Sequence, residues 1–342
     1  TFQTYFSNNN PAGLAALLHG SLLSPPVGGR LIAQAGLPVN FFVANPQFTS
    51  APSALGGGAF LVDNSGHSTY HSLQVEGDKR YSDGLTLQAS YVFSKALGSD
   101  SAGDSATFFS DYRTLRNKKL DKQRIAFDHA HVFKLNAIYE LPIGPGKLLG
   151  RGSRGVLARV IGGWQAGSIF TFFTGGPITF TGANGLNTSL AASPATQLGP
   201  MPEGAIQKVG NGVIYFPGIT QITDPSVANI TTLGNLRALS TLKAIAGPDG
   251  TPILVNALPG QLGGLSIGTA SAPPVWRLDA NLLKRIKINE RFTFQIGATA
   301  QNLTNSPQFA APNTSISSAN FGRITSTAIP YRILVLQSRL NF

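Results

Sequence analysis

Residues 333–342 read ILVLQSRLNF, and apolar and polar side chains alternate along this stretch. In an extended chain, one side carries Leu334, Leu336, Leu340 and Phe342, and the other carries Ile333, Val335, Gln337, Arg339 and Asn341. A strand with one apolar side and one largely polar side suits a wall between lipid and a polar lumen. The stretch therefore predicts a strand of a bacterial outer-membrane barrel. We expect Leu336, Leu340 and Phe342 to form a C-terminal signal for the barrel-assembly machinery.

The composition narrows the class of protein further. The 342 residues are 42% hydrophobic and 12% charged, and none is cysteine, so neither disulfides nor a thiolate metal site can hold the fold. The 26 Lys and Arg residues outnumber the 15 Asp and Glu residues, which gives a net charge of +11. Because these charges are scattered along the sequence without a stripe of arginine and aromatic residues, we expect no nucleic-acid partner.

The same alternation recurs along the chain. The predicted strands are residues 70–81, 85–94, 133–141, 163–174, 276–288, 292–301 and 333–342. They would be about 9 to 13 residues long, whereas strands of soluble proteins usually have about 5 to 6. No stretch approaches the ~20 consecutive apolar residues of a membrane helix, so the chain can span a bilayer only as a barrel wall.

The connections between these strands predict an orientation. Residues 82–84 and 289–291 are short turns, whereas 96–128, 175–275 and 303–330 are long loops. Outer-membrane barrels place short turns in the periplasm and long loops outside. The connection 142–162 is longer than a periplasmic turn should be. It carries Lys147, Arg151, Arg154 and Arg159 without an acidic residue, which favours a solvated basic turn and leaves contact with anionic headgroups as an alternative.

We therefore predict an all-β fold, a segment of a transmembrane antiparallel β-barrel with about seven long strands and long extracellular loops. Residues 1–69 are expected to be an extracellular loop region with short strands such as 59–62, and residues 70–342 to be the C-terminal barrel strands with their loops. Because about seven strands are fewer than the eight of the smallest barrels, we expect two unpaired edges in an isolated segment.

Several short motifs resemble Oar-like TonB-dependent receptors, in the same order along the chain. They are YHSLQVE at 70–76, RYSDGLT at 80–86, SYVFSK at 90–95, FDHAH at 127–131, YELPIG at 139–144, GGWQ at 162–165, TGGP at 174–177, NLTN at 302–305, NFGRI at 320–324 and the final strand. Each motif alone is weak, but together they cover residues 70–342 well and 1–69 loosely.

The resemblance implies the C-terminal barrel part of an outer-membrane transporter that moves an unknown cargo with energy from the inner membrane. Family members carry a regulatory-like domain and a plug, so this chain, which begins at Thr1 without a signal segment, is expected to be a fragment. The implied partners are outer-membrane lipid, the protein's own plug domain, the TonB complex and the barrel-assembly machinery. The alternative is an extracellular β-rich adhesion or surface-assembly protein without transport activity.

The most informative residues for function are charged side chains on the predicted lumen face. They are Glu76, Asp78, Arg80, Lys134, Glu140, Arg277, Asp279, Arg285, Lys287 and Arg339. Charges are costly toward lipid, so these residues either pair with one another or line a surface for a plug or cargo. Lys79 and Lys284 fall on the lipid side. Lys79 lies near a strand end and can extend its ammonium to the interface, whereas at Lys284 a β-bulge is expected.

Other chemistry is not supported. His129 and His131 stand two residues apart, but no third ligand has suitable spacing, so we expect them to begin a strand and not to bind a metal. No Gly-x-Ser-x-Gly elbow is present. We therefore expect neither an enzyme nor a cofactor.

Overall fold

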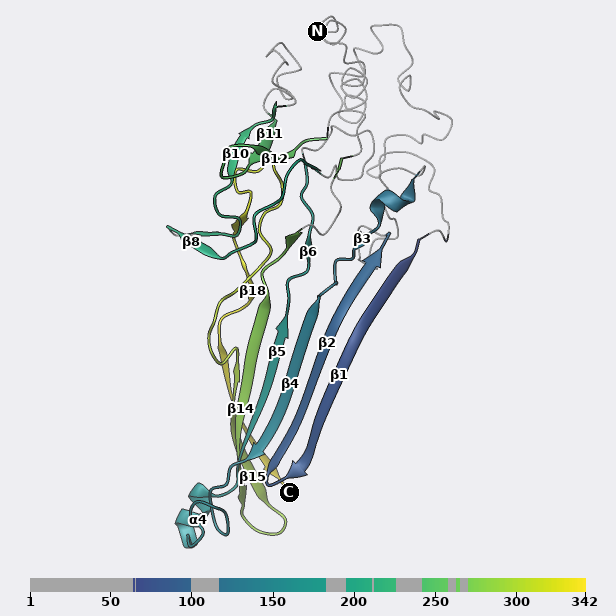
Figure 1. Ribbon diagram of the computed structural model, residues 1–342. Helices are drawn as coiled ribbons and strands as arrows, with labels where there is room; N and C mark the ends of the chain where they lie inside the picture. Colours follow the sequence, from purple (N-terminus) through teal and green to yellow (C-terminus); the bar gives the residue numbers. More distant parts are fainter. Residues whose placement is uncertain are drawn as a thin grey trace, which may run out of the picture.

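The computed structural model describes residues 64, 66–99, 117–182, 195–210, 212–225, 242–257, 263–264 and 270–342. Its main feature is an antiparallel sheet of long strands that run side by side (Figure 1). In spatial order these are β1 (Ser68–Ser82), β2 (Leu85–Gly98), β4 (His131–Glu140), β5 (Trp164–Phe173), β14 (Val275–Lys287), β15 (Thr293–Gln301) and β19 (Ile333–Asn341). The short β3 (Gln123–Arg124) adds to β2. The predicted long strands are thus confirmed, with ends shifted by a few residues.

The register of the sheet places the predicted apolar sides on one continuous face. Tyr91 pairs with Phe133, Phe133 with Phe172, and Phe172 with Trp276. These residues form an aromatic row toward the long-loop end of the strands, where aromatic belts of outer-membrane barrels lie. We call this side of the sheet the apolar face and the opposite side the polar face.

The sheet is an open wall. Among the described residues, β1 pairs only with β2 and β19 pairs only with β15. A closed barrel has no such edges. The two unpaired edges expected from the number of strands are therefore observed.

The hairpin between β1 and β2 turns at Asp83 and Gly84, which have φ values of 53° and 82°. Both central residues of a type I′ turn need a positive φ, and Asp-Gly is a preferred pair there. The register shifts between Lys79 and Ser82 just before this turn. The bulge predicted at Lys284 is wrong, because the pairing of β14 runs without a shift through Lys284 on both sides.

The connection between β4 and β5 is ordered and contains the helix α4 (Gly155–Ile161), which the sequence interpretation did not include. It lies at the same end of the strands as the first hairpin and the C-terminus (Figure 1). We call residues 142–162 the connector. Among the helices that the structure describes, none is long and apolar enough to cross a membrane.

At the opposite end, short strands form four small sheets. These strands are β6 (Pro177–Ile178), β7 (Thr196–Gln197), β8 (Gln207–Val209), β9 (Gly212–Ile214), β10 (Thr220–Thr223), β11 (Lys243–Ala246), β12 (Pro252–Val255), β13 (Ala270–Ser271), β16 (Gln308–Phe309), β17 (Arg323–Ile324) and β18 (Thr327–Ile329). A 3-10 helix, η2, covers Lys118–Asp121. We call the described residues of 177–271 and 308–329 that form these small sheets the loop unit.

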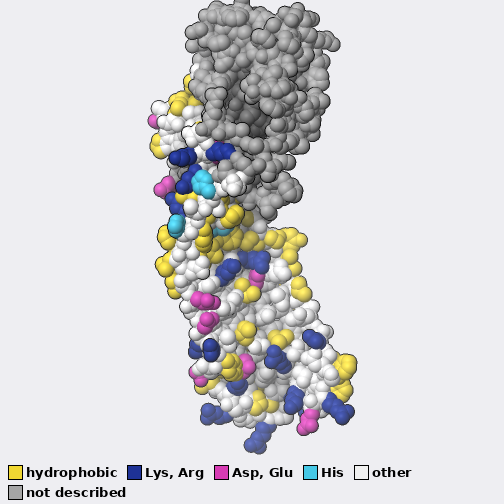
Figure 2. All heavy atoms as spheres, turned by 90° about the vertical axis from the view of Figure 1, so that its right-hand side faces the viewer, with side chains coloured by type: hydrophobic (Ala, Val, Ile, Leu, Met, Phe, Trp, Pro, Cys, Tyr) yellow, Lys and Arg dark blue, Asp and Glu magenta, His cyan; other side chains and the backbone are white. Residues whose placement is uncertain are grey.

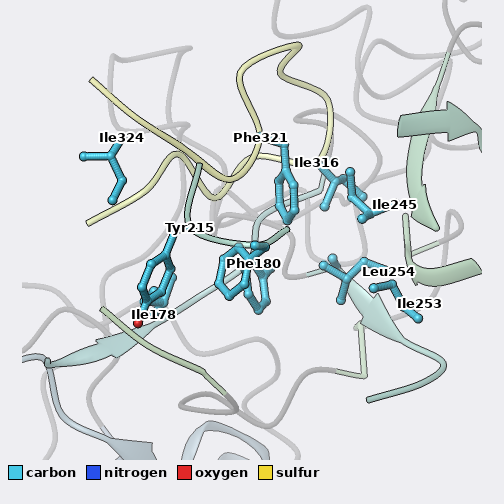
Figure 3. Packing of buried hydrophobic residues seen from close by; sticks show 11 residues of the cluster. Ile178, Phe180, Tyr215, Ile245, Ile253, Leu254, Ile316, Phe321 and Ile324 are labelled. Carbon is cyan, nitrogen blue, oxygen red and sulfur yellow. The ribbon is translucent and has the colours of Figure 1, made fainter. Parts of the chain in front are cut away.

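The loop unit has its own hydrophobic core (Figure 3). Phe180, which is fully buried, lies 5.8 Å from Phe216 and 5.7 Å from Phe321 between ring centroids. Leu254 and Ile316 are also fully buried in this cluster. The loops 175–275 and 303–330 therefore pack against each other, whereas the sequence interpretation had only surface loop at 175–275. The expected strand at 59–62 lies outside the described residues.

Candidate functional surface of the barrel wall

The register brings the predicted lumen residues onto the polar face. Along one row, Glu76 pairs with Ser90, Ser90 with Lys134, Lys134 with Thr171, and Thr171 with Arg277. Charges therefore occupy both ends and the middle of a row that crosses five strands. Such a row would be costly if it faced hydrocarbon.

Hydrogen bonds between side chains connect the acidic end of the polar face. The amide of Gln88 donates to Glu76 Oε1 at 3.2 Å, and the amide of Asn136 donates to Gln88 Oε1 at 3.4 Å. The ladder links β1, β2 and β4. Asp78 lies beside Gln88 in the register and is exposed. Of the two acidic residues of β1, Glu76 is thus held in part by a neutral amide.

Arg277 and Asp279 form an ion pair with 2.5 Å between Nη2 and Oδ2. The other oxygen of Asp279 accepts the backbone N–H of Asn302 at 2.9 Å. Asn302 has a φ of 50°, so the carboxylate fixes the point where the chain leaves β15. This pair holds a strand end in place and is only partly available to a ligand.

Glu140 lies at the short-turn end of the polar face. It accepts the hydroxyl of Tyr81 at 2.9 Å, and Lys147 Nζ lies 3.6 Å from the same oxygen. Tyr81 is the last residue of the predicted strand 70–81. It lies within the register shift that precedes Ser82, and its hydroxyl reaches a residue of the polar face.

Basic residues gather at the same end of the polar face. Arg285 pairs with Gln295 and Gln295 with Arg339, while Lys287 pairs with Thr293. We call Arg285, Lys287 and Arg339 the basic rim. Arg285 donates a hydrogen bond to Gln165 at 3.3 Å, but no member of the rim forms an ion pair with a residue that the structure describes.

The remaining predicted residues are also exposed. Arg80 lies within the register shift of β1, and Lys134 makes no ion pair among the described residues. Leu336 and Leu340 lie on the apolar face, paired with Ala298 and Phe294. Phe342 follows β19 and is 93% exposed. Their role as an assembly signal stays a prediction.

Lys284 lies on the apolar face, and contacts that the sequence did not indicate satisfy its charge. Its side chain is 4% exposed, and its ammonium donates to the carbonyl of Val160 at 2.8 Å and to that of Gly162. It also lies 5.2 Å from the ring centroid of Trp164. A cation at a helix C-terminus is favourable, so Lys284 caps α4.

The histidine pair holds strand ends. His131 begins β4, and its Nδ1 lies 2.8 Å from the hydroxyl of Tyr91. His129 Nδ1 lies 2.5 Å from the carbonyl oxygen of Thr174. Among the residues that the structure describes, no group of three metal-ligating side chains is found.

Asp128, the neighbour of this pair, is a structural residue that the sequence interpretation missed. It is 2% exposed and accepts the backbone N–H of Ala96 at 2.6 Å and Nε of Arg124 at 2.5 Å. Arg124 in turn donates to Ser271 at 2.9 Å. The residues thus tie the top of β2 to the strand that leads into β14. The sequence signal that could have identified Asp128 is its position directly before the histidine pair.

Long antiparallel strands with one apolar face, joined by short turns at one end and long loops at the other, define the wall of an outer-membrane β-barrel. A comparison with known protein families matches residues 17–334 to a family described as an outer membrane beta barrel domain. The chain belongs to this family, and the protein lies in the outer membrane. The short turns therefore face the periplasm and the loop unit lies outside. A search of curated proteins and a search of solved structures each found no match.

Proposed function

We propose that the wall belongs to a TonB-dependent receptor-like transporter of the Oar-like type, which moves a cargo across the outer membrane with energy from the inner membrane. The observation that carries the proposal is the basic rim. Its three cations lie on the polar face without an ion-pair partner among the described residues. Cations in such a position need water or an acidic surface, which a plug domain inside the barrel would supply.

The proposed partners are those that the resemblance to Oar-like receptors implies. They are a plug domain of the same protein inside the lumen, the TonB complex in the periplasm, outer-membrane lipid and the barrel-assembly machinery. The proposal includes neither an enzymatic activity nor a cofactor. The cargo is left open.

Cysteine labelling in the full-length protein tests the proposal. Gln295 lies between Arg285 and Arg339 on the polar face, and Ile296 lies next to it on the apolar face. In Gln295→Cys, a charged maleimide should react faster in energised cells than after a protonophore, because energy displaces the plug from the rim. In the control Ile296→Cys, labelling should be slow under both conditions.

An equal labelling rate of Gln295→Cys with and without energy would contradict the transport proposal. Equal labelling of both variants would contradict the assignment of the faces. Heat-modifiable migration on a gel confirms that each variant is folded.

The loop unit favours a second candidate, adhesion or surface assembly without transport. Its buried aromatic cluster gives the extracellular part a defined shape, which a binding surface needs. Substitution Phe216→Ala, which removes a ring from this cluster, would abolish attachment to other cells or surfaces if this candidate is right. Energy-independent labelling of Gln295→Cys together with that loss would favour adhesion over transport.

A further inference from the structure

The connector at the periplasmic end carries an unusual set of exposed side chains. Leu148, Leu149, Val156, Leu157 and Val160 are between 57% and 79% exposed. No residue of α4 is buried. A turn that is merely solvated has no need of so many apolar side chains, and contiguous exposed apolar surface marks a site of contact.

The connector holds these side chains on a folded scaffold. Gly144 donates to the carbonyl of Leu149 at 2.7 Å, and Leu149 donates to that of Pro142 at 2.9 Å. A side chain at Gly144 would meet Gly162 at 2.7 Å, so the two ends of the connector touch. Val156 and Leu157 lie four and three positions before Val160, and residues three and four positions apart share one side of a helix. The apolar surface is thus preformed.

The helix is attached to the apolar face of the wall. Trp164 donates its indole N–H to the carbonyl of Val160 at 3.1 Å, and Lys284 caps the same helix end. Trp164 and Lys284 pair in the register, in the row that continues to Ile296. This row belongs to the side of the sheet that faces lipid. Tryptophan is typical of the membrane–water interface, so the contact places α4 at the level of the headgroups.

The charges of the connector favour contact with anionic lipids. Arg151, Arg154 and Arg159 are exposed, and residues 142–162 contain no acidic residue. Lys147 is exposed too, but it pairs with Glu140 of the polar face. Basic side chains beside an exposed apolar helix are typical of interfacial helices that bind anionic headgroups. Lys and Arg side chains gather at this end of the molecule (Figure 2).

We propose that the connector is a membrane anchor in which α4 inserts its apolar side into the periplasmic leaflet and Arg151, Arg154 and Arg159 bind the phosphates of anionic phospholipids. The occupant is the bilayer, because the apolar side of α4 continues the lipid-facing surface of the wall. The anchor would fix the depth of β4, β5 and β14 in the membrane. The inference rests on the outer-membrane location and not on the transport proposal.

Spin labelling of the full-length protein in vesicles tests the anchor. Leu157 and Leu198 are 60% and 62% exposed, but Leu198 lies in the extracellular loop unit and serves as the matched control. Cysteine is absent from the 342 residues, so the variants Leu157→Cys and Leu198→Cys each add a single label to them. The vesicles contain phosphatidylethanolamine with or without phosphatidylglycerol.

In vesicles with phosphatidylglycerol, the label at position 157 should be severalfold more accessible to oxygen than to a water-soluble nickel reagent, and the label at 198 should show the reverse. Removing phosphatidylglycerol should lower the protection at 157. The double variant Arg154→Gln, Arg159→Gln should lose this lipid dependence, whereas the extracellular control Lys208→Gln should keep it.

Equal accessibility to the nickel reagent at 157 and 198 would overturn the anchor. Equal protection with and without phosphatidylglycerol would overturn the assignment of anionic headgroups. Protection that is present in native outer membranes and absent from both kinds of vesicle would overturn the lipid as occupant and indicate a periplasmic protein. Heat-modifiable migration again confirms folding of each variant.

Discussion

Lys284 and Lys79 provide a controlled test of the wall, because both are lysines on the apolar face near its periplasmic end. Lys79 pairs with Leu87 and is exposed, and its side chain forms no hydrogen bond or ion pair with any described residue. Lys284 is buried against the connector and donates to the carbonyls of Val160 and Gly162. Methionine has nearly the same length as lysine, so Lys→Met removes the charge while keeping the apolar stem.

The two substitutions should change the free energy of unfolding by different amounts or in opposite directions. A hydrogen bond from a charged group contributes about 1.5–3 kcal/mol, and Lys284→Met removes two of them and a cation–π contact. Hydration of the freed carbonyls and the ~0–1 kcal/mol gained by removing a cation near the membrane rim offset part of this loss. We therefore expect the free energy of unfolding to fall by about 2–4 kcal/mol for Lys284→Met. For Lys79→Met it should change by about 0–1 kcal/mol, toward greater stability.

Guanidinium unfolding in phosphatidylcholine vesicles, followed by tryptophan fluorescence, measures both values. Trp164 reports the site directly, because the ammonium of Lys284 lies 5.2 Å from its ring centroid. The variant Lys284→Arg keeps the charge and the donors and should recover part of the stability. An equal effect of the two methionine substitutions, or a gain in stability from Lys284→Met, would refute the reasoning that Lys284 caps α4.

Further predictions concern the faces, the upper end of the wall and the loop unit. A spin label at Leu87 should be more accessible to oxygen than to a nickel reagent, and one at Gln88 should show the opposite; equal accessibility at both sites would contradict the faces. Asp128→Ala leaves Arg124 without its buried partner and should cost about 3 kcal/mol, detected as faster proteolysis near residues 117–128; an unchanged cleavage rate would contradict this. Burial raises the pKa of Tyr215 above that of an exposed tyrosine, so hydrogen-exchange protection of the loop unit should be complete below about pH 10 and decrease as the pH rises further. The variant Tyr215→Phe should not show that decrease.

The strands were predictable because their signal is local. Alternation with a period of two and unusual length located the first strand at 70–81, where the structure has Ser68–Ser82, and the last at 333–342, where it has Ile333–Asn341. Once one face must be apolar, a shift of one residue would turn every side chain of a strand over. Matching the apolar rows therefore excludes odd shifts of the register but leaves shifts of two residues open.

The features that the sequence did not show depend on partners far along the chain. Lys284 is satisfied by a carbonyl 124 residues away, so the bulge inferred from its isolated position was wrong. The bulge lies instead between Lys79 and Ser82, where a tight turn follows. The core of the loop unit joins Phe180, Phe216 and Ile316, whose spacing follows no helical or strand period. Burial of this kind is decided by tertiary packing.

The net charge of +11 illustrates the same limit on the scale of the whole protein. Along the sequence the basic residues are scattered, which predicted no nucleic-acid partner. The wall brings two groups of them together at the periplasmic end, the basic rim on the polar face and the three arginines of the connector, whose helix is attached to the apolar face. Because a barrel wall separates lipid from lumen, two groups of equal sign at the same height meet different environments. Composition alone cannot distinguish these environments. The labels at Leu157 and Gln295 do, since the first should respond to the lipid and the second to cellular energy.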